Sequence, residues 1–410
     1  MSIFLTELVG GLILTLVSIR PLFIYAERIG SVDIRKVAQD PTPRLSDCPP
    51  MPAPITVGAA VDVFVGGMGT NSVYRIPAIA RTGSRLLAFA EGRAALGDIG
   101  TNDLVLAMSD DGGASWSPPR TLLDLPDRSI NNPCVVTLHA GPHAGRVIMV
   151  VQSYPADTHE HKQATGLDGP GVCRVHLVHS DDRGATWSDP RDVTASMRRP
   201  DAPTVASGPG AAIQLRSGKH AGRIVVPFNQ GPYGAWTVYI CFSDDAGATW
   251  TMGNVAPGGA PAHANEVQVA ELADGTILLN ARSFHGARCR LGARSTDGGA
   301  TWLALEPITG LPDPCCQGGM LSLEGGTGLV FTGCDSTTAR MQGSIWLSRD
   351  DGASWPIKVP LVPGFFAYSA PVDLGEGRLG VLAETDDYRK IRFIPVELAA
   401  SGHLRPVEER

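Results

Sequence analysis

Residues 109–116 read Ser-Asp-Asp-Gly-Gly-Ala-Ser-Trp, and four later segments repeat this S-x-D-x-G-x-[ST]-W pattern. The later copies are 180–187 (SDDRGATW), 243–250 (SDDAGATW), 295–302 (STDGGATW) and 348–355 (SRDDGASW). Consecutive copies start 52 to 71 residues apart, which suits one four-stranded blade with variable loops. One copy would indicate little, but five copies at this spacing predict a β-propeller.

Each position of the repeat has a physical role in a turn. The third-position Asp can accept hydrogen bonds from N–H groups of its own turn, and the fifth-position Gly permits a positive φ. The closing Trp is a large apolar side chain that can pack between sheets. Five of the seven tryptophans occupy this position. These five segments, hereafter the boxes, therefore predict a scaffold and say little about chemistry, because similar turns serve unrelated propellers.

The composition agrees with many short strands. The 410 residues include 48 Gly and 32 Pro, and 43% are hydrophobic. Segments between the boxes, such as 146–151 and 276–280, are apolar enough for buried strands. We therefore expect an all-β fold, a six-bladed β-propeller of four-stranded antiparallel blades. Five blades carry a box, and strands from both chain ends complete the sixth.

Charge and cysteine usage limit the possible ligands. The net charge of −7 argues against a nucleic-acid partner, although a few arginines in one pocket could still bind an anionic substrate. The eight cysteines include no C-x-x-C pair and no Cys/His spacing suited to zinc, so neither a metal nor a cofactor is expected. Cys173 and Cys241 lie in apolar runs, where buried free thiols are expected.

The N-terminal region predicts a targeting segment followed by a linker. Residues 8–19 form a largely apolar run of signal-peptide length. We interpret residues 1–30 as a cleaved signal or a membrane anchor, and the Pro-rich residues 31–57 as a linker. The propeller domain then spans residues 58–410. This organisation predicts an exported or membrane-anchored protein, with possible membrane association through the N-terminal segment.

Residues between the boxes carry the candidate chemistry. Tyr74-Arg75-Ile76-Pro77 begins the first blade, and an arginine in an apolar strand needs an anionic partner. A loop at 97–100 contains Asp98, with Asp103 as an alternative close by. The segment 265–282 contains Asn-Glu at its start and Asn-Ala-Arg at its end.

These motifs resemble the exo-α-sialidase family of glycoside hydrolases over about residues 61–396. The resemblance implies that Asp98 is the general acid, Glu266 the general base and Tyr368 the nucleophile. It implies the remaining substrate-binding set as well: Arg75, Arg282 and Arg340 for the substrate carboxylate, Arg93 lining the pocket, and Glu384 holding Arg75. The family usually has Tyr-Glu where this chain has Ala383-Glu384. Glu271 is a second glutamate close to Glu266 in the sequence, and alternation along a strand should direct it to the opposite face.

The residue types fit a sialic acid substrate chemically. Three guanidiniums can bind its carboxylate with oriented, charge-assisted hydrogen bonds. A neutral phenol avoids the repulsion that a carboxylate nucleophile would meet, and sialidases are the known tyrosine exception among glycosidases. We therefore expect retaining hydrolysis, with Asp98 kept protonated until it donates to the leaving oxygen.

The expected substrates are sialylated glycoproteins, glycolipids such as gangliosides, or oligosaccharides. A trans-sialidase or a KDN-preferring sialidase would carry the same residues, so both remain alternatives. A non-catalytic sialoglycan-binding propeller is the third alternative, although it would not need Tyr368, Glu266 and Asp98 together. The loops at 131–133 and 208–214 are further candidates for the pocket wall.

Overall fold

The structure, a computed structural model, describes residues 55–156, 158–259 and 263–399. The chain is all-β in this part, as predicted. Its helical pieces are α3 (Thr194–Met197), η2 (Glu160–Lys162) and η3 (Glu324–Gly326). None of the described helices is long and apolar enough to cross a membrane. The predicted signal or anchor at residues 1–30 lies outside the described residues.

Four of the five hydrogen-bonded sheets are small. The first contains β3 (Val73–Thr82), β4 (Arg85–Arg93), β5 (Asp103–Ser109) and β6 (Arg120–Leu123). The second contains β7 (Arg128–Thr137), β8 (Val147–Pro155), β9 (Arg174–Ser180), β10 (Arg191–Asp192) and β12 (Gly210–Ala211). The third contains β11 (Val205–Ser207), β13 (Ile213–Gln214), β14 (Ile224–Gln230), β15 (Thr237–Ser243) and β16 (Thr251–Met252). The fourth contains β17 (Ala264–Glu271), β18 (Ile277–Ser283), β19 (Cys289–Ser295) and β20 (Glu306–Pro312).

The fifth sheet has eight strands and joins the two ends of the domain. It contains β21 (Gly319–Ser322), β22 (Leu329–Cys334), β23 (Met341–Ser348), β24 (Ile357–Gly375), β25 (Arg378–Thr385), β26 (Lys390–Leu398), β1 (Ile55–Val57) and β2 (Val61–Val65). The first half of the long strand β24 pairs with β23, and its second half pairs with β25. One continuous strand therefore belongs to two groups, β21 to β24 on one side and β24 to β26 with β1 and β2 on the other.

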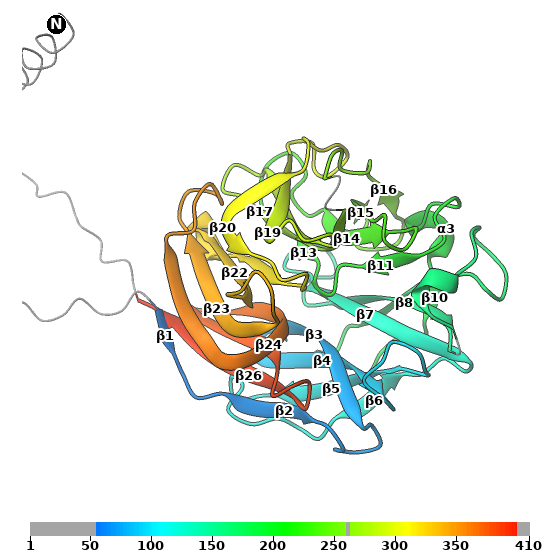
Figure 1. Cartoon of the computed structure of the whole chain (residues 1–410), viewed down its shortest axis with the longest axis horizontal. Helices are drawn as coiled ribbons and strands as arrows, with labels where there is room; N and C mark the ends of the chain where they lie inside the picture. Colours follow the sequence, from blue (N-terminus) through cyan, green and yellow to red (C-terminus); the bar gives the residue numbers. More distant parts are fainter. Residues whose placement is uncertain (1–54, 157, 260–262, 400–410) are drawn as a thin grey trace, which may run out of the picture. The chain divides into compact units, whose positions relative to one another are not determined.

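The prediction that strands from both chain ends share a sheet is confirmed. Both β1 and β2 pair antiparallel with β26, and the blue strands β1 and β2 lie beside the red strand β26 in Figure 1. The predicted boundary of the linker at residue 57 is three residues too late. Ile55, Thr56 and Val57 pair with residues 396–398 and belong to the folded domain, because three β-branched residues after the prolines suit a strand at the sheet edge.

The sheets follow one another around a common centre (Figure 1). Contacts run from β3 to β7, from β7 to β11 and β12, and from these to β17. They continue through β21 and β24 and return to β3. These strands therefore contact one another in a closed ring, and hydrophobic clusters fill the spaces between adjacent sheets.

The boxes form the turns that the sequence predicts. Each begins at the last residue of a strand, namely β5, β9, β15, β19 or β23. In the first box, Asp111 Oδ1 accepts from Ser109 Oγ at 2.8 Å and from the N–H of Ser115 at 2.9 Å. The other four boxes repeat these two bonds. The repeat is thus a locally closed hydrogen-bonded unit.

Gly113 and Trp116 explain why the box also joins neighbouring sheets. Gly113 has φ of 95°, and a Cβ there would lie 2.1 Å from the ring of Phe393 on β26. The ring of Trp116 packs 5.4 Å from that same phenylalanine. In the next box, Trp187 packs against Phe89 of the preceding sheet. The predicted packing of box tryptophans between sheets is confirmed at these positions.

Four of the strands nearest the centre carry a β-bulge. The pairing register shifts between Arg75 and Ala78 on β3 and between Asn131 and Cys134 on β7. It also shifts between residues 265 and 267 on β17 and between residues 366 and 369 on β24. Bulges of this kind re-aim side chains relative to strict alternation. All four occur near the same end of the central ring.

We predict that the box aspartates stabilise the fold. Asp350 accepts from Ser348 Oγ, the N–H of Ser354 and Ser354 Oγ at 2.6–2.9 Å, and the bonds from Ser354 are the main cause of a pKa of about 2. Asp350→Asn removes the charge and should lower the melting temperature by about 2 °C or more. A lowered carboxyl pKa adds stability above its usual value of 3.8, so the difference should be full at neutral pH and shrink on acidification towards pH about 2.

The neighbouring Asp351 provides a matched control. It has φ of 56°, which asparagine tolerates, so Asp351→Asn should melt near the wild-type temperature. Equal melting temperatures for Asp350→Asn and Asp351→Asn, measured by circular dichroism, would contradict a stabilising role for the box.

Candidate active site

A cavity of about 180 Å³ opens where the four bulges lie. It is lined by strand ends from several sheets: Arg75 and Ile76 from β3, Arg93 from β4, Asn131 and Asn132 from β7, Asn265 and Glu266 from β17, Arg282 from β18 and Tyr368 from β24. Loop residues also line it, namely Asp98, His159, Tyr233, Phe284 and Arg340, together with Glu160 on η2 and with Gln152, Tyr154, Ala206 and Asn229 on strands. None of the five boxes contributes to this wall, and the structure describes all five.

The structure brings the sequence-predicted residues together. Asp98, Glu266, Tyr368, Arg75, Arg93, Arg282 and Arg340 all line the cavity, and the side chain of Glu384 lies directly behind Arg75. The predicted loop at 131–133 contributes to the wall. The loop at 208–214 does not, because Pro209 O accepts from Gln268 and Gln317 beneath the cavity and Gln214 faces the other end of the ring.

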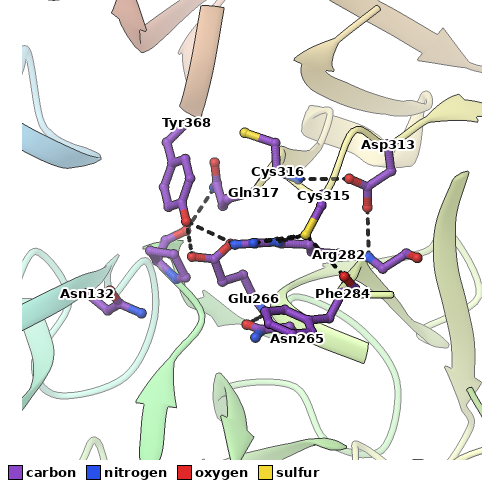
Figure 2. Close-up of polar contacts among 12 residues, drawn as sticks. Asn132, Asn265, Glu266, Arg282, Phe284, Asp313, Cys315, Cys316, Gln317 and Tyr368 are labelled. Carbon is purple, nitrogen blue, oxygen red and sulfur yellow. Dashed lines mark hydrogen bonds and ion pairs between the residues drawn. The ribbon is translucent and has the colours of Figure 1, made fainter. Parts of the chain in front are cut away.

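Tyr368 and Glu266 form the central pair of the site. Tyr368 donates its hydroxyl hydrogen to Glu266 Oε1, and Arg282 Nη1 donates to Glu266 Oε2 at 2.5 Å and to Tyr368 Oη at 3.2 Å. Figure 2 shows the three side chains meeting at the phenol oxygen. Burial and the charge of Glu266 hold the pKa of Tyr368 well above its usual value. The phenol is therefore neutral, with a carboxylate in place to accept its proton.

The bulge in β17 turns Glu266 towards Tyr368. Asn265 and Val267 pair with consecutive residues of β18, which leaves Glu266 as the extra residue. The N–H of Glu266 donates to Asn265 Oδ1 at 2.5 Å. The alternation of side chains that was expected to direct Glu271 away from Glu266 is therefore interrupted between the two residues. Glu271 lies at the other end of β17, where it accepts from Arg216 and Ser217.

Glu384 connects β3 to β24, the strand that carries Tyr368. Its Oε1 accepts from Arg75 Nε at 2.6 Å and from the N–H of Ile76 at 2.8 Å. Its Oε2 accepts from the N–H of Tyr368 at 3.3 Å. Glu384 is fully buried, and these charge-assisted bonds offset the cost of burying its carboxylate.

Arg340 completes an arginine clamp, which we define as Arg75, Arg282 and Arg340. Arg340 Nη1 donates to Tyr388 Oη at 2.7 Å, and Nη2 donates to Cys315 O at 3.2 Å. The guanidinium also lies 5.3 Å from the centre of the Tyr368 ring. Three cations around one small cavity create a strong preference for an anion, and a planar carboxylate matches the paired N–H groups of a guanidinium.

Asp98 differs from the expected protonated state. Its side chain is 54% exposed and lies 2.8 Å from Arg93 Nη1. Partial burial raises the pKa of Asp98, but the charge of Arg93 and the hydrogen bond from it lower the pKa by more, below its usual value. The expectation that Asp98 is kept protonated is therefore wrong for this arrangement, in which it is an ionised partner of Arg93. The alternative acid, Asp103, does not line the cavity, and burial and Asp124 raise its pKa to about 6.

Several residues at the site had no sequence signal. Cys315 Sγ lies 3.1 Å from Arg282 Nη2 and donates to Phe284 O at 3.3 Å. Glu91, fully buried, accepts from both Arg93 Nε and Nη2. Burial and the charges of Asp98 and Glu266 raise the pKa of Glu160 to about 8.

The cysteines behave largely as predicted. Cys173 and Cys241 are buried and free, and all seven cysteines in the described part of the chain are free thiols. No group of three or more His, Cys, Asp or Glu side chains among the described residues could hold a metal ion.

A second, larger cavity lies at the other ends of the same strands. It measures about 430 Å³ and is lined by residues 79–81 of β3, 135–137 of β7 and 371–373 of β24, among others. The titratable pairs described above lie in the smaller cavity, so the chemistry is placed there.

Comparison with known proteins gives a consistent assignment. The model of the BNR repeat-like domain matches residues 84–381. A sialidase of Micromonospora viridifaciens is 31% identical over 371 residues, which cover 84% of this chain and 54% of that protein. The chain thus spans about half the length of this curated relative.

Solved structures agree with the sequence comparison. A Hadza microbial sialidase has a TM-score of 0.75 at 25% identity, covering 83% of this chain and 68% of that one. The intramolecular trans-sialidase from Ruminococcus gnavus, solved with oseltamivir carboxylate, has a TM-score of 0.72 at 19% identity and covers 83% and 99%. On the repeat, the fold and these relatives, the chain belongs to the BNR-repeat sialidase family.

Proposed function

We propose that this chain is an exo-α-sialidase that hydrolyses terminal α-linked sialic acids from glycoproteins, glycolipids or oligosaccharides with retention of configuration. The observation that carries the proposal is the contact between Tyr368, Glu266 and Arg282 inside an arginine clamp. A neutral polysaccharide would have no use for three guanidiniums at one small cavity.

The proposed scaffold is a six-bladed β-propeller. The division of β24 between two groups of strands supports this count, because the eight-stranded sheet then supplies two blades and the other sheets supply one each. The cavity lies at one mouth of the central ring. We also propose that residues 1–30 direct export or anchor the protein to a membrane, which places the site where sialylated glycans occur.

The proposed first step forms a bond between Tyr368 Oη and the anomeric carbon. The clamp binds the carboxylate on that carbon, and Glu266 Oε1 takes the phenol proton as the oxygen attacks. Asp98, protonated from solvent, donates its proton to the leaving oxygen, and the glycosidic bond breaks. The clamp offsets the negative charge of the substrate carboxylate. A neutral phenol can then approach the anomeric carbon without the repulsion that a carboxylate nucleophile would meet.

The second step reverses these roles. Asp98, now a carboxylate, takes a proton from water, whose oxygen attacks the anomeric carbon. The bond to Tyr368 breaks, and the phenol oxygen recovers its proton from Glu266. Two inversions at one carbon give net retention.

A transfer reaction is the second candidate. The rim carries the half-exposed Tyr233, whose ring lies 5.8 Å from those of His159 and Phe284. An aromatic surface of this kind suits stacking by an acceptor sugar. Product analysis in the presence of lactose separates transfer from hydrolysis. Comparing the rates of cleavage of a KDN glycoside and an N-acetylneuraminic acid glycoside identifies a KDN-preferring enzyme.

The first test is release of fluorophore from 4-methylumbelliferyl sialoside. Tyr368→Phe removes the attacking oxygen and should lower kcat/KM by at least about 100-fold. Tyr239→Phe is the matched control, because the Tyr239 hydroxyl donates to Met197 O away from the cavity. Wild-type turnover by Tyr368→Phe would rule out the proposed nucleophile. An inactive wild-type protein that still binds a sialoside would favour the alternative of a non-catalytic sialoglycan-binding propeller.

The second test decides between Asp98 and Asp103. Asp98→Asn should lower kcat/KM by about 100-fold or more on sialyllactose, and by less on the aryl sialoside, whose leaving group needs little protonation. Asp103→Asn should stay within about two-fold on both, because Asp103 does not line the cavity. The reverse pattern would assign the acid to Asp103.

The third test uses the pH dependence of kcat/KM. Because Asp98 acts as an acid only when protonated, the rate should fall as pH rises through its lowered pKa. Removing the positive charge in Arg93→Gln should raise that pKa and move the alkaline limb of the profile to higher pH. Arg93→Lys keeps a charge and should move it less. If the alkaline limb of the kcat/KM profile stays at the same pH in Arg93→Gln, Arg93 does not set the pKa of Asp98.

A further inference from the structure

Tyr388 lies between two arginines of the clamp although it does not line the cavity. Its hydroxyl oxygen accepts from Arg340 Nη1 at 2.7 Å. The guanidinium of Arg75 lies 4.3 Å from the centre of its ring. One side chain thus makes a hydrogen bond to one clamp arginine and a cation–π contact to another.

The backbone holds Tyr388 in an uncommon conformation. Asp386, Asp387 and Tyr388 have φ of 54°, 53° and 64°, a left-handed turn between β25 and β26 that residues other than glycine seldom adopt. The Tyr388 ring packs edge-on against Phe365, with ring centres 4.6 Å apart. The turn and the aromatic contact together fix the direction of the side chain.

The charges of the clamp explain what Tyr388 contributes. Arg75 pairs with Glu384, and Arg282 pairs with Glu266. Among the residues that the structure describes, Arg340 has no carboxylate within ion-pair distance. Its hydrogen-bond partners are a phenol and a peptide carbonyl, and burial keeps that phenol neutral by raising the pKa of Tyr388. Arg340 is therefore oriented without being neutralised.

We propose that Tyr388 is a positioning residue for the substrate carboxylate, acting through Arg340 and Arg75. This inference rests on the proposed function, since it assigns the clamp to a sialic acid carboxylate. A rigid neutral partner keeps Arg340 aimed at the cavity while its whole charge stays available to the ligand. The contact with Arg75 fixes the spacing of the two guanidiniums, so both can bind one carboxylate.

The test compares two ligands that differ only in that carboxylate. They are 2,3-dehydro-2-deoxy-N-acetylneuraminic acid and its methyl ester, with affinities measured by calorimetry. In Tyr388→Phe the affinity for the acid should fall about 10-fold, because a hydrogen bond that orients a charged group is lost. The affinity for the ester should change less than about two-fold. On the aryl sialoside, KM should rise while kcat stays within about three-fold.

A second variant and a control separate positioning from folding. Tyr388→Asn also removes the ring, and asparagine tolerates the left-handed conformation, so the acid should lose more affinity than in Tyr388→Phe. Tyr239→Phe removes a hydroxyl away from the cavity and should leave the acid-to-ester ratio unchanged.

Two results would overturn the inference in distinguishable ways. If wild type prefers the acid and Tyr388→Phe keeps the same acid-to-ester ratio, Tyr388 does not position the clamp, and the proposed function stands. If wild type neither cleaves the aryl sialoside nor binds either ligand, the proposed function fails and this inference fails with it.

Discussion

The buried carboxylate of Glu384 is the interaction on which the site and the closure of the ring both depend. It accepts from Arg75 and Ile76 on β3 and from the N–H of Tyr368 on β24. Arg75 and Ile76 lie 309 and 308 positions before Glu384 in the chain. A carboxylate removed from water needs such partners to offset its desolvation. Because those partners belong to the first and last sheets, the contact that joins these two sheets also places Tyr368 beside the clamp.

The charges of the cavity follow from the same constraint. Three of the four arginines at the cavity have a carboxylate partner that limits the cost of removing them from water: Glu266 for Arg282, Glu384 for Arg75, and Glu91 for Arg93. Arg340 departs from this pattern, with neutral hydrogen-bond partners in the described structure. A pocket in which every cation were neutralised would attract an anion weakly. One guanidinium oriented by neutral groups keeps a net positive potential where the substrate carboxylate is proposed to bind.

The fold was predictable where the interactions are local. The bonds of a box lie within eight residues, so Asp111 and its partners leave a readable pattern, and five copies give the architecture. The site residues were predictable through a family resemblance that covers most of the chain. Tyr388 and Cys315 left no signal, because their roles depend on Arg340 and Arg282, which approach only after the ring closes. The ionised state of Asp98 was missed for a related reason, since spacing alone does not show that Arg93 points at it.

Stability and chemistry are separated within each blade by the geometry of its strands. The boxes end the third strands, whereas the cavity is built from strands nearest the centre. Regular alternation on those inner strands would direct successive side chains to opposite faces. Bulges at Arg75–Ala78, at Asn131–Cys134 and at residues 265–267 and 366–369 break that alternation near the cavity. Each disrupts the ladder of hydrogen bonds locally, whereas the box turns keep their own hydrogen bonds at the edge. A scaffold stabilised at its edge can therefore tolerate irregular backbone at its centre, and that irregularity turns Glu266 towards Tyr368.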